Sequence, residues 1–204
     1  MNPTLFKGPL VDPFAHLPRP RIAFVGRLAA QKSVHTLVKA VPRLRTPGVQ
    51  VLLVGDGLQR PKLEALVHEL GLEDRVHFIG FVPHEEVPAV LNHVDALVLP
   101  SVSEELGSVL LETTQSGLPI VASRTGGIPD VIREGENGLL FTPGNAGELA
   151  GAVDRVLKEP ELASRLGTEA RRRAKYYDWN RLAEQVLEIY RSVMSRHRQQ
   201  KTLK

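Results

Sequence analysis

Two cations and two carboxylates have the residue types and spacing to bind an anionic ligand that carries hydroxyl groups. Arg27 and Lys32 flank a turn that follows an apolar run, and Glu104 and Glu112 are separated by seven residues. A charge-assisted hydrogen bond to phosphate contributes about 1.5–3 kcal/mol, so two convergent cations can hold a diphosphate without a glycine-rich loop. On their spacing alone, Arg27 and Lys32 fit equally well as solvated surface charges.

The segment that contains both carboxylates predicts a turn that leads into an apolar helix. The first amides of such a helix attract anions by about 0.3–1 kcal/mol and bind phosphate or sugar oxygens. These amides belong to Leu106, Gly107 and Ser108. Glu112 interrupts the apolar run of the helix. It either lies on a solvent-facing stripe with Ser108, Gln115 and Ser116, or accepts hydrogen bonds from vicinal hydroxyls such as those of a ribose.

The elements that must position these residues follow from the hydrophobic pattern. Short apolar runs alternate with longer amphipathic stretches, which is typical of repeated βα units. Most of the runs are continuous, and therefore predict strands that are buried on both faces of a parallel sheet. Strands are expected at 22–25, 51–54, 76–79, 96–99, 119–122 and 138–141, and helices near 32–45, 60–70, 85–93, 107–117, 127–134, 147–158, 160–176 and 178–197.

The predicted fold class is α/β: a Rossmann-like, doubly wound parallel sheet of about six strands, with extra C-terminal helices. In such sheets ligands bind beyond the carboxyl ends of the strands. The four charged residues follow two of the expected strands, so they are expected at that edge.

The composition excludes several classes of protein and site. A chain of 204 residues, 42% hydrophobic and 24% charged, is expected to form one sizeable globular domain. The absence of Cys excludes disulfides, a thiol nucleophile and Cys-based metal sites, and none of the seven His has the spacing of metal ligands. We therefore expect no metal and no cofactor. A secretory signal and an apolar window of about 18 residues are both missing, which favours a cytoplasmic location.

Positive charge is concentrated towards the C-terminus. The segment from Arg171 to Lys204 has ten Lys or Arg and three acidic residues, a net charge of +7, whereas the preceding residues carry −4. Because the excess positive charge lies in this segment and not in the body of the domain, we expect no nucleic-acid partner. The favoured interpretation is a solvated helix face, and the alternative is peripheral contact with an anionic membrane surface or a partner domain. The expected last helix also has one apolar stripe, which either packs on this domain or drives self-association; it comprises Leu182, Val186, Ile189 and Val193.

A series of motifs covers nearly the whole chain, from about Val11 to about Tyr190. The motifs are Gly26-Arg27-Leu28 with Lys32, Val54-Gly55-Asp56-Gly57, Phe78-Ile79-Gly80-Phe81-Val82, Pro100-Ser101, the pair Glu104 and Glu112, Gly117-Leu118-Pro119-Ile120-Val121-Ala122-Ser123, Gly126-Gly127-Ile128-Pro129 and Asn137-Gly138-Leu139-Leu140. In order and spacing the series resembles the C-terminal, nucleotide-sugar-binding domain of the GT4-like retaining glycosyltransferases of GT-B fold, the glycosyl transferases group 1.

The resemblance implies a role for each matching residue. Arg27 and Lys32 would bind the donor diphosphate and stabilise it as a leaving group, and Glu104 would meet hydroxyls of the transferred sugar. These three would be the catalytic residues. Glu112 would bind the ribose hydroxyls. The remaining nucleotide-sugar-binding groups would be Gly26, the amides of Leu106, Gly107 and Ser108 around the sugar or its distal phosphate, and main-chain groups of Gly80, Phe81 and Val82 around the base.

One departure from the family pattern bears on affinity. Glu105 stands where the family usually has Gly, and adds a carboxylate close to the expected diphosphate. Like charge at this position weakens binding unless the side chain turns towards solvent.

The expected function is the donor-binding half of a retaining transferase that moves a hexosyl group from a nucleoside-diphosphate sugar to an acceptor. Residues 1–20 resemble an interdomain linker, 21–177 form the donor-binding domain, and 178–204 form an amphipathic helix with a basic tail. An N-terminal acceptor-binding domain or split-enzyme partner would complete the enzyme, so little transfer is expected from this chain alone.

The alternative is a non-catalytic interaction module with a decayed nucleotide-sugar site and a docking tail. A sugar-nucleotide epimerase half ranks below both.

Overall fold

The computed structural model describes residues 12–105, 108–177, 183–184 and 186–194. Its centre is a six-stranded sheet in the order β3-β2-β1-β4-β5-β6, and each neighbouring pair is parallel. The strands are β1 (Arg21–Val25), β2 (Gln50–Val54), β3 (Val76–Gly80), β4 (Ala96–Leu99), β5 (Ile120–Ser123) and β6 (Leu139–Phe141). The predicted fold class is confirmed.

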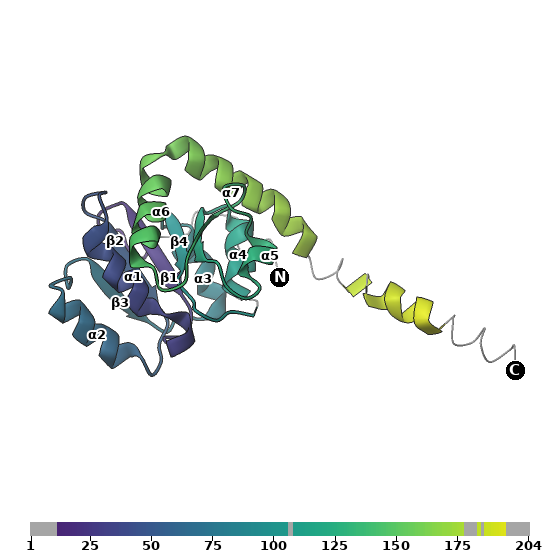
Figure 1. Ribbon diagram of the computed structural model, residues 1–204, viewed down its shortest axis with the longest axis horizontal. Helices are drawn as coiled ribbons and strands as arrows, with labels where there is room; N and C mark the ends of the chain where they lie inside the picture. The colour runs from purple at the N-terminus through teal and green to yellow at the C-terminus, as the bar shows by residue number, and fades with distance from the viewer. Residues whose placement is uncertain (1–11, 106–107, 178–182, 185, 195–204) are drawn as a thin grey trace, which may run out of the picture.

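The strands lie between two layers of helices, as Figure 1 shows. Ile22 and Phe24 of β1 pack in one hydrophobic core, and Ala23 and Val25 pack in a second. Alternate side chains therefore enter opposite cores, which explains why the strands read as continuous apolar runs. The helices are α1 (Val34–Ala40), α2 (Arg60–Glu69), α3 (Val87–Leu91), α4 (Ser108–Ser116), α5 (Ile128–Val131), α6 (Ala146–Lys158) and α7 (Pro160–Ala174).

Several helices are shorter than the sequence predicts, and two of the differences have a local cause. The expected helix at 32–45 is divided at Ser33, whose φ of 48° separates the 3-10 turn η2 (Ala30–Lys32) from α1. The expected helix at 127–134 ends as α5 at Val131, because Asn137 closes its C-terminal end. The Asn137 side chain donates to the Val131 carbonyl at 2.9 Å and accepts from the Arg133 amide at 2.7 Å.

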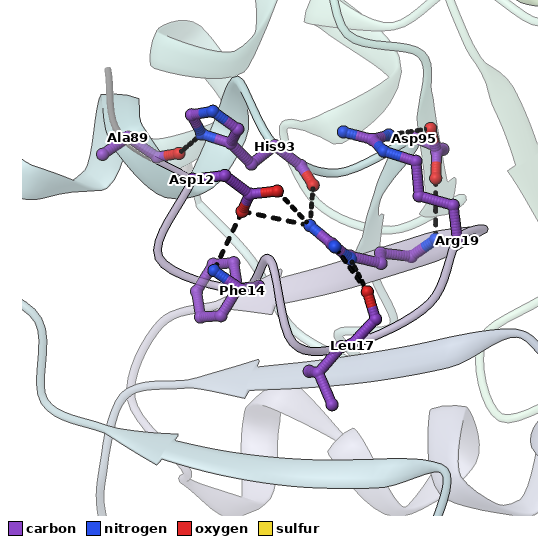
Figure 2. A network of polar contacts seen from close by, with 8 residues as sticks. Asp12, Phe14, Leu17, Arg19, Ala89, His93 and Asp95 are labelled. Carbon is purple, nitrogen blue, oxygen red and sulfur yellow. Dashed lines mark hydrogen bonds and ion pairs between the residues drawn. The ribbon is translucent and has the colours of Figure 1, made fainter.

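The segment before β1 packs against the amino ends of the strands. The Arg21 side chain is only 4% exposed and donates to Asp12 at 2.8 Å and to the Leu17 carbonyl at 3.1 Å. The Arg21 amide donates to Asp95, which precedes β4, at 2.7 Å. Figure 2 shows this network, in which Asp12, Leu17 and His93 surround the Arg21 guanidinium. Residues 12–20 are therefore fixed at the edge opposite the carboxyl ends; the predicted linker role of 1–20 stays a prediction.

The C-terminal helices cover one side of the domain. In α7, Gly167 lies so close to α4 that a Cβ there would be 1.9 Å from the Gly117 carbonyl oxygen. Residues 183–184 and 186–194 are helical, and Val186, Ile189 and Val193 are half or more exposed, so these three do not pack on the domain; Leu182 lies outside the described residues. None of the helices in the described ranges has both the length and the apolar character needed to cross a bilayer.

Candidate functional site

The loops that carry the four charged residues meet at the carboxyl edge of the sheet. The ladder between β1 and β4 joins only Ile22 to Ala96 and Ala23 to Leu97, both towards the amino ends. Strand order reverses between these two strands, so the crevice of a doubly wound sheet is expected beyond them. The loop after β4 then contacts η2, because the Val102 amide donates to the Gln31 carbonyl at 2.9 Å.

Lys32 and Glu104 form an ion pair across this junction. The Lys32 ammonium contacts Glu104 Oε2, and Ser101 Oγ donates to the same oxygen at 3.1 Å. Both side chains are largely shielded from solvent, with exposed fractions of 18% for Lys32 and 10% for Glu104. An ammonium group has three donors, so Lys32 keeps hydrogen-bonding capacity for an anion. Two residues that are 72 positions apart are thus held together.

Two glycines permit the position of Glu104. The loop after β5 lies against residues 104 and 105, and the Gly127 amide donates to the Glu104 carbonyl at 3.0 Å. A Cβ would be 1.7 Å from the Glu104 carbonyl oxygen if placed at Gly126, and 1.9 Å from that of Glu105 if placed at Gly127. Real Cβ atoms do not approach so closely, so the backbone contact depends on both glycines. The Glu105 side chain is exposed, which relieves the expected repulsion.

Arg27 lies on an ordered turn with an exposed side chain. The Gly26 amide donates to the Val54 carbonyl and the Leu28 amide to the Asp56 carbonyl, both at 2.9 Å. These bonds tie the turn after β1 to the turn after β2. Within the part of the chain that the structure describes, Arg27 has no ion pair, so its guanidinium is free to bind an anion.

Glu112 is buried rather than on a solvent-facing stripe. The residue is 5% exposed, and burial raises the pKa of its carboxyl, with the positive charge of His84 acting against that rise. His84 lies in the 3-10 turn η4 (His84–Glu86), and its Nδ1 is 3.7 Å from Glu112 Oε1. Sequence reasoning did not single out His84, because a pair formed between two elements that are distant in the sequence has no characteristic spacing.

The predicted base-binding segment follows β3 directly. Gly80 ends the strand with a φ of 82° and accepts from the Gly55 amide at 2.7 Å. Phe81 is 79% exposed, whereas Val82 packs partly against the second core. Ser108 begins α4, and Leu106 and Gly107 lie outside the described residues.

The described residues contain no group of three or more His, Cys, Asp or Glu side chains that could hold a metal ion. That the site works without metal or cofactor stays a prediction. The groups present are two cations, two carboxylates and an exposed aromatic ring, carried by loops, the turn η2 and the helix α4.

Comparison with known proteins identifies relatives of this chain. The family described as glycosyl transferases group 1 matches residues 13–173. The alpha-D-kanosaminyltransferase of Streptomyces kanamyceticus is 38% identical over 178 residues, which cover 86% of this chain and 46% of that protein. The chain spans about half the length of the curated relatives it matches.

Solved structures of glycosyltransferases share the fold. Sucrose-phosphate synthase from Thermosynechococcus elongatus has a TM-score of 0.85 and 34% identity, over 96% of this chain and 51% of that chain. HepE from Anabaena, solved in complex with UDP-glucose, has a TM-score of 0.86 and 27% identity, over 94% of this chain and 56% of that chain. The match over residues 13–173, together with the parallel sheet of the GT-B glycosyltransferases, shows that this chain belongs to the glycosyl transferases group 1 family.

Proposed function

We propose that this chain binds a nucleoside-diphosphate sugar at the carboxyl edge of its sheet and supplies the donor half of a retaining hexosyl transfer. The observation that carries the proposal is the convergence of Lys32 and Glu104 beside the turn that holds Arg27. A structural neighbour, HepE, is solved with UDP-glucose, which supports this class of ligand.

In the proposed complex the two cations bind the diphosphate. Transfer breaks the bond between the sugar C1 and the distal phosphate oxygen, and forms a bond from C1 to the acceptor oxygen, whose proton passes to the leaving diphosphate. Negative charge then develops on the leaving diphosphate, and fixed cations stabilise that charge as it forms. Among the described residues Arg27 has no ion-pair partner to release, and Lys32 is already held in place by Glu104. Glu104, oriented by Ser101, accepts from the sugar hydroxyls.

The nucleoside occupies the other side of the site. Glu112 is a buried carboxylate whose lone pairs suit the two hydroxyls of a ribose. Phe81 follows β3 and presents its exposed ring as a face on which a base can stack, beside the main chain of Gly80 and Val82. Recognition by stacking and main-chain groups leaves open which base is bound.

Calorimetric titration with UDP, GDP and ADP tests donor binding. We expect at least one of them to bind, and the double variant Arg27→Ala, Lys32→Ala to lose about two orders of magnitude in affinity, because each charge-assisted bond contributes about 1.5–3 kcal/mol. The matched control is Lys39→Ala, Arg43→Ala, which removes two exposed cations away from the site. Unchanged binding by the first double variant, or no binding of any nucleotide at millimolar concentration, would overturn the proposal.

The alternative, a docking module, is favoured by one observation. The helical residues at 186–194 expose Val186, Ile189 and Tyr190, and the basic segment continues beyond them. A module with a decayed site binds no nucleotide, so the same titration separates the two functions.

A further inference from the structure

We propose that His84 is a positioning residue for the nucleoside: its protonated imidazole pairs with Glu112 and holds that carboxylate ionised for the ribose hydroxyls. Nucleotide affinity then contains a component that depends on the charge of this one histidine. The inference rests on the proposed function, because it assigns a further residue to the same site.

The geometry brings together a shielded anion and an accessible cation. Glu112 is almost fully buried on α4, whereas the side chain of His84 is 68% exposed on η4. The distance of 3.7 Å between His84 Nδ1 and Glu112 Oε1 is longer than a hydrogen bond, so the contact is electrostatic. It leaves the carboxylate lone pairs available to a ligand.

Few charged side chains lie on the two elements that carry His84 and Glu112. Apart from Glu112, α4 has no titratable side chain, and α3, which packs against both α4 and η4, has none. Helix α7 also packs against α4, and its Arg171 donates to the Ser116 carbonyl at the C-terminal end of α4. The other charged side chains of α7 are Glu161, Arg165, Glu169, Arg172 and Arg173. On η4 itself the other charged groups are Glu85 and Glu86, both exposed. Burial raises the pKa of the Glu112 carboxyl, and among the described residues His84 is the charged group that acts against that rise.

Protonation of His84 should therefore strengthen nucleotide binding. A buried carboxyl tends to take up a proton, and a protonated carboxyl loses part of its capacity to accept hydrogen bonds from ribose. An imidazolium nearby favours the carboxylate. Histidine is the side chain whose charge ordinarily changes between pH 5 and 8, so measurements at pH 6 and pH 8 test whether nucleotide affinity depends on this pair.

The test measures the dissociation constant of the tightest-binding nucleoside diphosphate for wild type and His84→Ala at pH 6 and pH 8. The ratio of the two constants cancels the titration of the nucleotide's own phosphate. We expect a ratio of about three to five at pH 6, the size of a partly exposed ion pair, that falls towards one at pH 8. His84→Lys keeps a cation at both pH values and should retain affinity throughout. The matched control is His68→Ala, which removes another exposed histidine paired with a carboxylate, Glu73.

The possible outcomes distinguish a failure of the proposed function from a failure of the role assigned to His84. If wild type binds no nucleotide, the proposed function fails and the role of His84 fails with it. If wild type binds and Arg27→Ala, Lys32→Ala does not, but the His84→Ala ratio is the same at both pH values, the site stands and the inference about His84 is overturned. An equal effect of His68→Ala would show that the pH dependence comes from the protein as a whole.

Discussion

At the scale of single residues, Glu112 is unfavourable for the fold and suited to a ligand. A buried carboxylate with no hydrogen-bonded cation destabilises the folded state when it is ionised, which is why burial raises its pKa. Glu104 is different, because Lys32 and Ser101 both contact it. A group that is retained in an unfavourable environment is a candidate for function.

The substitution Glu112→Gln should maintain or raise the stability of the protein while it weakens nucleotide binding. Glutamine has a similar shape without the charge, so the variant should melt at the same or a higher temperature than wild type at pH 7. A raised pKa in the folded state gives stability that is present at low pH and lost as pH rises through that pKa, so the difference in melting temperature should disappear near pH 4.

Nucleotide affinity of the same variant should fall about tenfold or more, because hydrogen bonds to a charged acceptor contribute about 1.5–3 kcal/mol. Thermal unfolding and calorimetric titration on the same samples measure both effects. Unimpaired nucleotide binding would contradict the assignment of Glu112 to the ribose.

At the scale of elements, the site is held by close backbone contacts between loops. Gly127 lies where a Cβ would be 1.9 Å from the Glu105 carbonyl oxygen, with ordinary negative φ, so the restriction there is contact rather than conformation. Lys32 reaches Glu104 only because this loop lies where it does.

Gly127→Ala should displace the loop that carries Glu104. We expect a loss of about 1–3 kcal/mol in stability, typical of overpacking, together with weaker nucleotide binding. Gly151→Ala on α6 is the matched control, because a Cβ there meets no atom within 4 Å and alanine favours a helix. Denaturant unfolding should show the control at or above wild-type stability, and a Gly127→Ala protein as stable as wild type would refute the contact.

The elements that could be predicted are those whose structure is determined by residues that are close together in the sequence. All six strands were predictable because each contains a short apolar run. Strands β1, β2, β4 and β5 are buried throughout, whereas β3 and β6 are buried in part. The division of the expected helix at Ser33 and the early end of α5 were not predictable. The first depends on one backbone angle, and the second depends on the side chain of Asn137, which bonds to a carbonyl six residues before it. Arg27, Lys32, Glu104 and Glu112 were identifiable as a series of motifs, whereas the burial of Glu112 and its pairing with His84 exist only in three dimensions.

At the scale of the whole molecule, this Rossmann-like unit covers 51% of the sucrose-phosphate synthase chain. In the proposed function, the described site supplies cations and carboxylates for a donor. Nothing among the described residues has been assigned to an acceptor. In the proposed reaction the acceptor oxygen must be held close to the sugar C1 while the diphosphate leaves, and such positioning contributes about 7–11 kcal/mol.

The chain alone, saturated with its donor, should therefore transfer sugar at least about 10⁵-fold more slowly than a two-domain member of the family assayed with its own donor and acceptor. The measurement is release of nucleoside diphosphate and formation of glycosylated product, with Lys32→Ala as the control, because turnover that survives this change does not come from the site. Donor affinity should stay measurable under the same conditions. Turnover within a hundredfold of the two-domain enzyme would mean that this chain binds the acceptor as well. The proposal that it binds the donor and that another domain binds the acceptor would then be wrong.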